Sequence, residues 1–106
     1  MKKYRSFDDV KEDYFRKHPQ EIDDFVTIIF EEYAKDGDTS ALLSSLRTVS
    51  RVKGITAIAE EIGISRNGVQ KALSEHGNPK FESINSIMHA IGYSLMPQRM
   101  QAGDAR

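Results

Sequence analysis

The chain has 106 residues, of which 39% are hydrophobic and none is cysteine. This length suits one ordinary domain with a single modest core. The lack of cysteine excludes a disulfide framework, a thiolate metal cluster and a cysteine nucleophile, and it favours the reducing cytoplasm. The first residues lead into acidic positions without an apolar stretch, and no later apolar run is long enough for a bilayer. We therefore expect a cytoplasmic protein with neither a secretory signal nor a membrane span.

Charge is divided unevenly along the chain. Residues 1–38 contain seven Lys and Arg against eleven Asp and Glu, a balance of −4, whereas residues 39–106 contain eight against five, a balance of +3. We expect the basic part to attract phosphate and the acidic part to attract a basic protein. A solvated helix face is the other interpretation of the acidic part, and the sequence leaves both open.

Two amphipathic helices are predicted in the acidic part. Ser6 followed by Asp8 and Asp9 is typical of a capped helix start, and Pro19 closes this first helix. Pro19 also suits the first turn of a second helix, which ends at Gly37. The apolar stripes at helical spacing are Phe7, Val10 and Tyr14 in the first helix, and Ile22, Phe25, Val26, Ile29 and Tyr33 in the second.

The basic part begins with a third helix. Asp38 or Thr39 is expected to cap it, and Gly54 ends it. Its apolar stripe consists of Leu42, Leu43, Leu46, Val49 and Val52. A helix of this length with one apolar face is more typical of a scaffold than of a binding site.

Shorter helices with tight breaks follow. They are predicted over residues 56–62, 65–74 and 81–91, separated by Gly63 and by the Gly77-Asn78-Pro79 turn. The expected buried row of the last helix is Phe81, Ile84, Ile87 and Ile91, and Gly92 stops it. Residues 93–96 alternate weakly, which leaves open one short C-terminal strand. Together these elements predict an all-α fold, a compact bundle of five to six helices.

Residues 55–74 carry the pattern of a helix-turn-helix. Such a motif needs a small residue where its two helices cross and a glycine that turns the chain between them; these are Ala59 and Gly63. The apolar positions that lock the pair onto the core are Ile58, Ile62, Ile64, Val69 and Ala72. An ordinary helical hairpin would not require all of these agreements at fixed offsets. We therefore predict a DNA-binding helix-turn-helix.

The second helix of this motif has a polar face suited to the major groove of DNA. Arg66 and Gln70 are four residues apart, as are Asn67 and Lys71, and we expect all four opposite the apolar positions of the helix. Arg binds guanine with two hydrogen bonds, and Asn and Gln bind adenine in the same way. These four residues are the predicted base contacts, with Lys71 suited to a phosphate or a guanine.

Predicted phosphate contacts surround this helix. Ser65 is expected to cap it, which leaves its positive end near the DNA backbone. Further hydroxyl, amide and ammonium groups lie at the starts of the neighbouring helices, where they would set the register on DNA. These residues are Thr56, Asn78, Lys80 and Ser83.

An enzymatic function is not indicated. His18, His76 and His89 are far apart in sequence, with no two at metal-ligand spacing. The chain carries neither a glycine-rich phosphate loop nor a serine-nucleophile motif. We expect no catalytic residue, no metal site and no cofactor. His18 and His76 are interpreted as surface residues, and His89 as partly covered.

The motif and the helix order around it resemble the Cro and Xre class of phage-type repressors. More closely, residues 7–97 resemble the addiction-module antidote proteins, the HigA-like antitoxins of toxin-antitoxin pairs. The residues that carry this resemblance are Gly37-Asp38, Ala59-Glu-Glu-Ile-Gly-Ile-Ser-Arg66, Lys71-Ala-Leu-Ser74 and Gly77-Asn78-Pro79. Two positions depart from the family pattern: Gln70 replaces an aromatic residue, and Lys80 replaces a small capping hydroxyl.

The resemblance implies a homodimer that binds double-stranded operator DNA, represses its own operon and neutralises a toxin resembling the RelE and HigB ribonucleases. On this interpretation, residues 1–38 form an acidic helical segment packed on the core, residues 39–97 form the DNA-binding domain, and residues 98–106 form a loose tail. The alternatives are a solitary phage-type regulator without a toxin and a protein-interaction module without DNA binding.

Toxin contacts are predicted in the first helix, because aromatic anchors within an acidic setting suit an interface with a basic protein. The candidate residues are Phe7, Asp8, Glu12, Tyr14 and Phe15. The alternative is that these aromatic side chains only cover the bundle.

Overall fold

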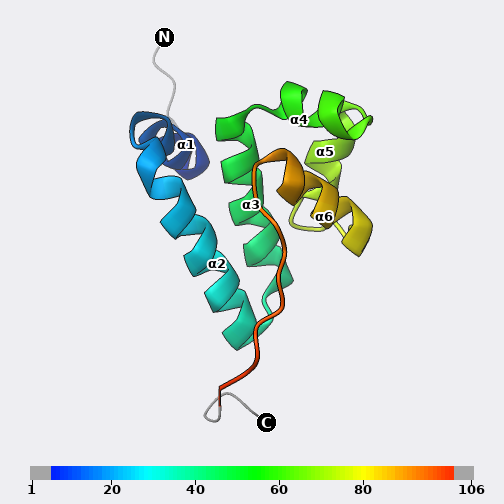
Figure 1. Ribbon diagram of the computed structural model, residues 1–106. Helices are drawn as coiled ribbons and strands as arrows, with labels where there is room; N and C mark the ends of the chain where they lie inside the picture. Colours follow the sequence, from blue (N-terminus) through cyan, green and yellow to red (C-terminus); the bar gives the residue numbers. More distant parts are fainter. Residues whose placement is uncertain (1–5, 102–106) are drawn as a thin grey trace.

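Capping residues and glycines set the bounds of the helices in the computed structural model, which describes residues 6–101 (Figure 1). The elements are α1 (Phe7–Lys17), the short 3-10 helix η1 (Pro19–Glu21), α2 (Ile22–Asp36), α3 (Thr39–Lys53), α4 (Ile55–Ile62), α5 (Arg66–Ala72) and α6 (Phe81–Ala90). The fold is an all-helical bundle, as the sequence predicts.

The helix starts in the acidic part follow the predicted caps. The Ser6 hydroxyl accepts a hydrogen bond from the Asp9 N–H at 3.0 Å, and the Asp9 carboxylate accepts one from the Ser6 N–H, which completes a capping box. Pro19 opens η1 rather than α2, so α2 begins one short turn later than expected. At its far end, Gly37 takes a φ of 66°, the left-handed conformation that ends helices.

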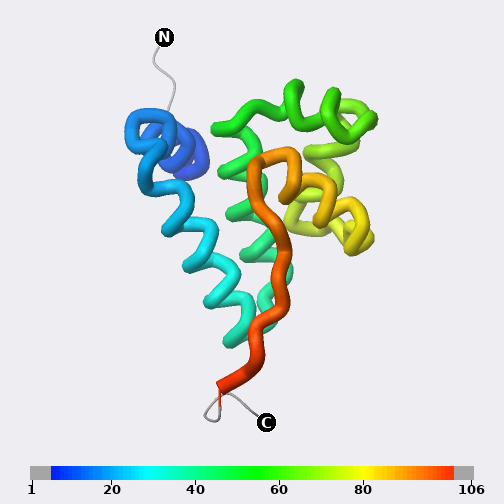
Figure 2. Tube along the Cα trace, in the orientation of Figure 1, coloured from blue at the N-terminus to red at the C-terminus, as the bar shows by residue number. Residues whose placement is uncertain are grey.

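Helix α3 lies between two groups of helices, with α1 and α2 on one side and the α4–α6 group on the other (Figures 1 and 2). Asp38 caps α3 by accepting a hydrogen bond from the Ala41 N–H at 3.0 Å. Leu46 and Val49 of this helix are almost fully buried, because both groups of helices pack against it. Each α-helix contributes to one apolar core, whose buried members are Phe15, Ile22, Val26, Leu43, Leu46, Val49, Ile55, Ile58, Ala59, Val69, Leu73, Ile87, Met88 and Ile91.

In the C-terminal part, the expected burial of Phe81 is wrong, and the strand that the sequence leaves open at residues 93–96 is not formed. Phe81, the first residue of α6, is 75% exposed, whereas the buried residues of this helix, Ile87 and Met88, lie near its end. The part of the chain that the structure describes contains no β-strand; residues 93–101 have neither helix nor strand. The Tyr93 hydroxyl donates to Asp23 of α2, and Leu95 packs against the core, so this segment is held by side chains rather than by a ladder.

The remaining predicted tail residues, 102–106, lie outside the described residues. Among residues 6–101, none of the helices has both the length and the apolar character needed to cross a membrane. Within the same range, no group of three or more His, Asp or Glu side chains is arranged to hold a metal ion. His18 is half-buried and His76 exposed, and His89 is exposed rather than partly covered.

Candidate nucleic-acid interface

The turn between α4 and α5 has the geometry that the sequence predicts. Gly63 adopts a φ of 80°, a conformation that side chains with a Cβ rarely take. The N–H groups of Gly63 and Ile64 both donate to the Ala59 carbonyl, at 2.9 and 3.1 Å. Ala59 and Val69 are buried where the two helices pack together. Ile64 differs from the prediction, because it is 45% exposed and does not lock the pair onto the core.

Helix α5 begins at a side-chain cap. The Ser65 hydroxyl accepts a hydrogen bond from the Gly68 N–H at 2.9 Å. A Cβ built on Gly68 would lie 3.3 Å from this hydroxyl, so the cap and the glycine are closely packed. Ser65, before the exposed residues Arg66 and Asn67, is therefore joined to Gly68, after them, and this contact holds the first turn of α5 in place.

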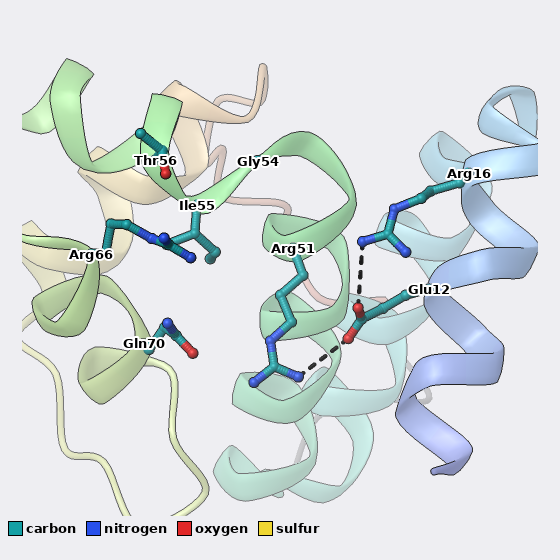
Figure 3. A pocket seen from close by; sticks show the side chains of 8 residues that line it. All are labelled: Glu12, Arg16, Arg51, Gly54, Ile55, Thr56, Arg66 and Gln70. Carbon is teal, nitrogen blue, oxygen red and sulfur yellow. Dashed lines mark hydrogen bonds and ion pairs between the residues drawn. The ribbon is translucent and has the colours of Figure 1, made fainter. Parts of the chain in front are cut away.

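The polar residues of α5 form two rows rather than one. Arg66 and Gln70 line a hollow beside α3, whereas Asn67 and Lys71 are exposed and do not line it (Figure 3). The two rows follow from the helical repeat, because neighbouring residues are separated by about 100° around the axis. No acidic residue occurs in α5.

The hollow has a volume of about 340 Å³ and joins elements that are far apart in the sequence. Its lining residues are Glu12, Arg16, Arg51, Gly54, Ile55, Thr56, Arg66 and Gln70. Glu12 is almost fully buried and forms ion pairs with Arg51 at 3.2 Å and with Arg16 at 3.5 Å (Figure 3). Sequence reasoning missed Arg16 and Arg51 as members of a site, since basic residues are common in the last turn of a helix and only packing brings these two together.

The predicted phosphate-contacting residues lie at three places. Thr56 is exposed in the first turn of α4 and lines the hollow. Asn78 and Lys80 are exposed before α6, whereas Ser83 is half-buried in its first turn. Lys80 occupies the N-cap position of α6 without a side-chain cap hydrogen bond, in keeping with its departure from the usual hydroxyl. Their contact with DNA stays a prediction, as does that of Ser65.

The C-terminal end of α5 is anchored by residues that the sequence analysis did not single out. Arg47 Nη1 donates to the Leu73 carbonyl at 2.8 Å, and Ser40 Oγ donates to the Glu75 carbonyl at 3.0 Å. A Cβ at Gly77 would come within 2.9–3.0 Å of three carbonyl oxygens of this end, so the close turn requires glycine. Both donors come from α3, which therefore fixes the orientation of α5.

The proposed toxin-contacting residues of α1 are divided between surface and interior. Phe7 is 75% exposed, Tyr14 is exposed and Asp8 is half-buried. Phe15 packs in the core and Glu12 is occupied by the two arginines, so neither is accessible to a partner, and we withdraw both from the candidate contacts. Tyr14 donates to the carboxylate of Glu21, and this hydrogen bond raises the pKa of the phenol.

Comparisons with known proteins give the family. The family model described as "Probable addiction module antidote protein" matches residues 5–99. A relative from Haemophilus influenzae, described as an uncharacterized protein, is 31% identical over 74 residues, which cover 70% of this chain and 76% of the relative. No solved structure matches the chain. Because the family match covers most of its length, the chain belongs to the family of probable addiction module antidote proteins.

Proposed function

We propose that this antidote protein is a sequence-specific DNA-binding repressor, and that α4 and α5 form a helix-turn-helix of the Cro and Xre kind. The observation that carries the proposal is the outer face of α5, where Arg66, Asn67 and Lys71 are exposed on a helix without acidic residues. This helix is capped at its start and anchored at its end, so its polar side chains stand on a rigid base.

The side chains of α5 have the chemistry that base recognition requires. Arg66 suits guanine and Asn67 suits adenine, because each can make two hydrogen bonds to that base in the major groove. Lys71, one turn after Asn67, suits a phosphate or a guanine. Gln70 is half-buried at the hollow, and we assign it a smaller share of base readout than the sequence alone predicts.

The proposed operator is a palindrome bound by two copies of the chain. Helix-turn-helix proteins commonly bind as dimers whose two recognition helices enter successive major grooves. We propose a homodimer of this kind, which represses the operon that encodes it. We propose that the protein acts as a repressor in the cytoplasm and catalyses no reaction.

A toxin is the second partner, because membership of an antidote family implies one. We propose that this protein is HigA-like and that its toxin is a ribonuclease similar to RelE and HigB. An enzyme that binds RNA needs a basic surface to contact the phosphates. Residues 1–38 carry a net charge of −4 and would attract such a surface. The candidate contacts that remain are Phe7, Asp8 and Tyr14, all on α1.

The test of DNA readout is a double variant, Arg66→Ala with Asn67→Ala. Affinity is measured by fluorescence anisotropy for a duplex from the region upstream of the gene and for a random duplex of equal length. Each lost base contact should cost roughly 1 to 3 kcal/mol of specific binding and leave binding to random DNA less affected.

Lys35→Ala is the matched control, because it removes one exposed positive charge at the far end of α2. It should leave the ratio of the two affinities unchanged. If the double variant also kept the parent ratio, base readout by α5 would be rejected, and a protein-interaction module would be the better description.

Toxin binding is tested with the product of the neighbouring reading frame. Asp8→Lys should slow association with that product, more strongly at low salt, because the charge lies at a partly exposed rim. Operator binding should not fall. If no neighbouring product bound the protein or was neutralised by it, the proposed ribonuclease partner would be wrong.

A further inference from the structure

We infer that the hollow between α1, α3 and α5 binds a phosphate of the DNA backbone and that Arg51 is its central ligand. The inference rests on the proposed DNA-binding function and extends the interface beyond the α4–α5 pair. It assigns a role to α3 and α1, which the sequence analysis treated as scaffold and as toxin-binding surface.

Three guanidinium groups from three different helices line this hollow. Arg16 belongs to α1, Arg51 to α3 and Arg66 to α5, and Thr56 adds a hydroxyl from α4 (Figure 3). Glu12 is the single acidic residue among the lining side chains. With three positive charges and one negative charge, the lining carries a net charge of +2 in the absence of a ligand.

Arg51 is positioned rather than neutralised by Glu12. Its Nη1 atom pairs with Glu12 Oε2 at 3.2 Å, and its other terminal nitrogen is directed toward α5 (Figure 3). Because a guanidinium group carries five donors in a planar fork, one carboxylate leaves donors free for a second anion. The buried carboxylate therefore holds one side of the Arg51 guanidinium group, while the side chain lines the hollow and is 35% exposed.

Arg16 contributes less to the positive charge than Arg51 does. It pairs with Glu12 at 3.5 Å and also with Asp13 at 3.2 Å, so two carboxylates share its charge. Its side chain is about half exposed at the outer edge of the hollow. We assign Arg16 to the edge of the hollow, where its charge would attract the DNA backbone without binding a phosphate directly.

The location of the hollow favours a backbone phosphate over a free anion. Arg66 and Gln70 form its wall, and they stand on the helix that is proposed to enter the major groove. The phosphates that border a major groove lie beside the helix that occupies it. A basic hollow beside α5 is thus where the sugar-phosphate backbone would pass, and the planar Arg fork matches phosphate oxygens well.

The test is the salt dependence of DNA binding by Arg51→Gln. Neutralising one phosphate contributes about 0.9 to the slope of log K against log salt concentration for duplex DNA. The variant should therefore lower the parent slope by about 1, and it should weaken binding to the upstream duplex and to the random duplex by similar factors. Arg51→Lys should keep most of the slope, because it keeps the charge.

Two further variants separate this effect from folding and from net charge. Arg51→Gln leaves Glu12 with a single partner, so Glu12→Gln with Arg51→Gln is measured as well; it removes the buried charge together with its partner and should show the same loss of slope. Lys35→Gln removes one positive charge far from the hollow and should change the slope by clearly less. Each variant is first checked by a circular dichroism melt, so that only variants folded at the assay temperature are compared.

The outcomes distinguish this inference from the proposed function. If the parent prefers the upstream duplex but Arg51→Gln, alone and combined with Glu12→Gln, keeps the parent slope, the phosphate site is rejected and sequence readout stands. If the parent lacks a preference but these two charge-removing variants lose slope while Arg51→Lys keeps it, the phosphate site stands and sequence readout is rejected. If the parent binds neither duplex, both are rejected.

Discussion

Helices α5 and α1 are both short, yet residue type predicts burial well in α5 and less well in α1. In α5, Val69 and the following Leu73 point inward and the charged residues point outward, as their side-chain types predict. In α1, Glu12 is buried while Phe7 is exposed. The difference arises because a carboxylate can be buried where it is paired with arginines, whereas the row of Phe7, Val10 and Tyr14 lies on the exposed side of α1.

This contrast shows when residue type is a good guide to surface function. The face of α5 is determined by one apolar row within the same helix, so the exposed residues follow from the periodicity. In α1, the burial of Glu12 depends on a contact with Arg51, which is 39 residues away. An acidic composition therefore misleads at Glu12, because one of the two arginines that pair with it, Arg51, belongs to another helix.

The substitution with the largest expected effect on stability tests whether the helices on the two sides of α3, namely α1 with α2 and α4 with α5 and α6, share one core. Leu46 is fully buried in α3 between the two groups of helices, so Leu46→Ala should destabilise the protein by about 2 to 5 kcal/mol through lost contacts and a cavity. Urea unfolding followed by circular dichroism measures this loss. Ile28→Ala, at an exposed site on α2, is the control and should stay within about 0.5 kcal/mol. Two separate unfolding transitions in the parent would show that the regions are independent.

A second variant strains only the turn between α4 and α5. Gly63→Val should cost on the order of 1 to 3 kcal/mol, because valine is strained at a φ of 80° although open space surrounds the site. The melting temperature and DNA affinity should fall together. Ala34→Val, which adds a branched side chain at an exposed helical position of α2, serves as the control and should change stability by less than about 1 kcal/mol. A Gly63 variant that melted like the parent would contradict the assigned role of the turn.

Removing the N-cap of α5 and, separately, the N-cap of α1 compares the two helices through a smaller loss of stability. Ser65→Ala and Ser6→Ala each remove a hydroxyl that accepts a backbone hydrogen bond, and each should cost about 1 kcal/mol. Thermal melts measure the two losses. Only Ser65→Ala should also weaken DNA binding, since it loosens the first turn of α5. Equal effects of both variants on DNA affinity would mean that α5 has no special place in the interface.

The smallest effect concerns the contact of Tyr93 with α2 and appears only at high pH. Burial, together with the hydrogen bond to Asp23, raises the pKa of the Tyr93 phenol above its ordinary value of about 10. The folded state then holds this proton more tightly than the unfolded chain does. The stabilisation is therefore complete below pH 10 and is lost as the pH rises above that value.

Tyr93→Phe should remove this alkaline loss while leaving the Tyr14 contact intact. Chemical denaturation at a series of pH values from 8 to about 11 compares the two proteins. The parent should lose stability more steeply than the variant above pH 10. Parallel curves would show that the Tyr93–Asp23 bond does not persist in solution.

The sequence by itself determined the helices and the face of α5. Caps at Ser6, Asp38 and Ser65 and glycines at positions 37, 54 and 63 are local signals, and the structure places helix ends at each of them. Apolar periodicity likewise predicts which residues of α2, α3 and α5 turn inward. These features were predictable because they depend on residues within a few positions of one another.

Tertiary structure alone decided the surroundings of α5. Arg47 and Ser40 anchor its end, and Arg51 joins Glu12 in the hollow beside it, through contacts between residues 26 to 39 positions apart. No periodic pattern records such pairs, since each arginine is an ordinary surface residue within its own helix. The missing strand at residues 93–96 has the same cause, because a strand needs a partner that the all-helical fold does not supply.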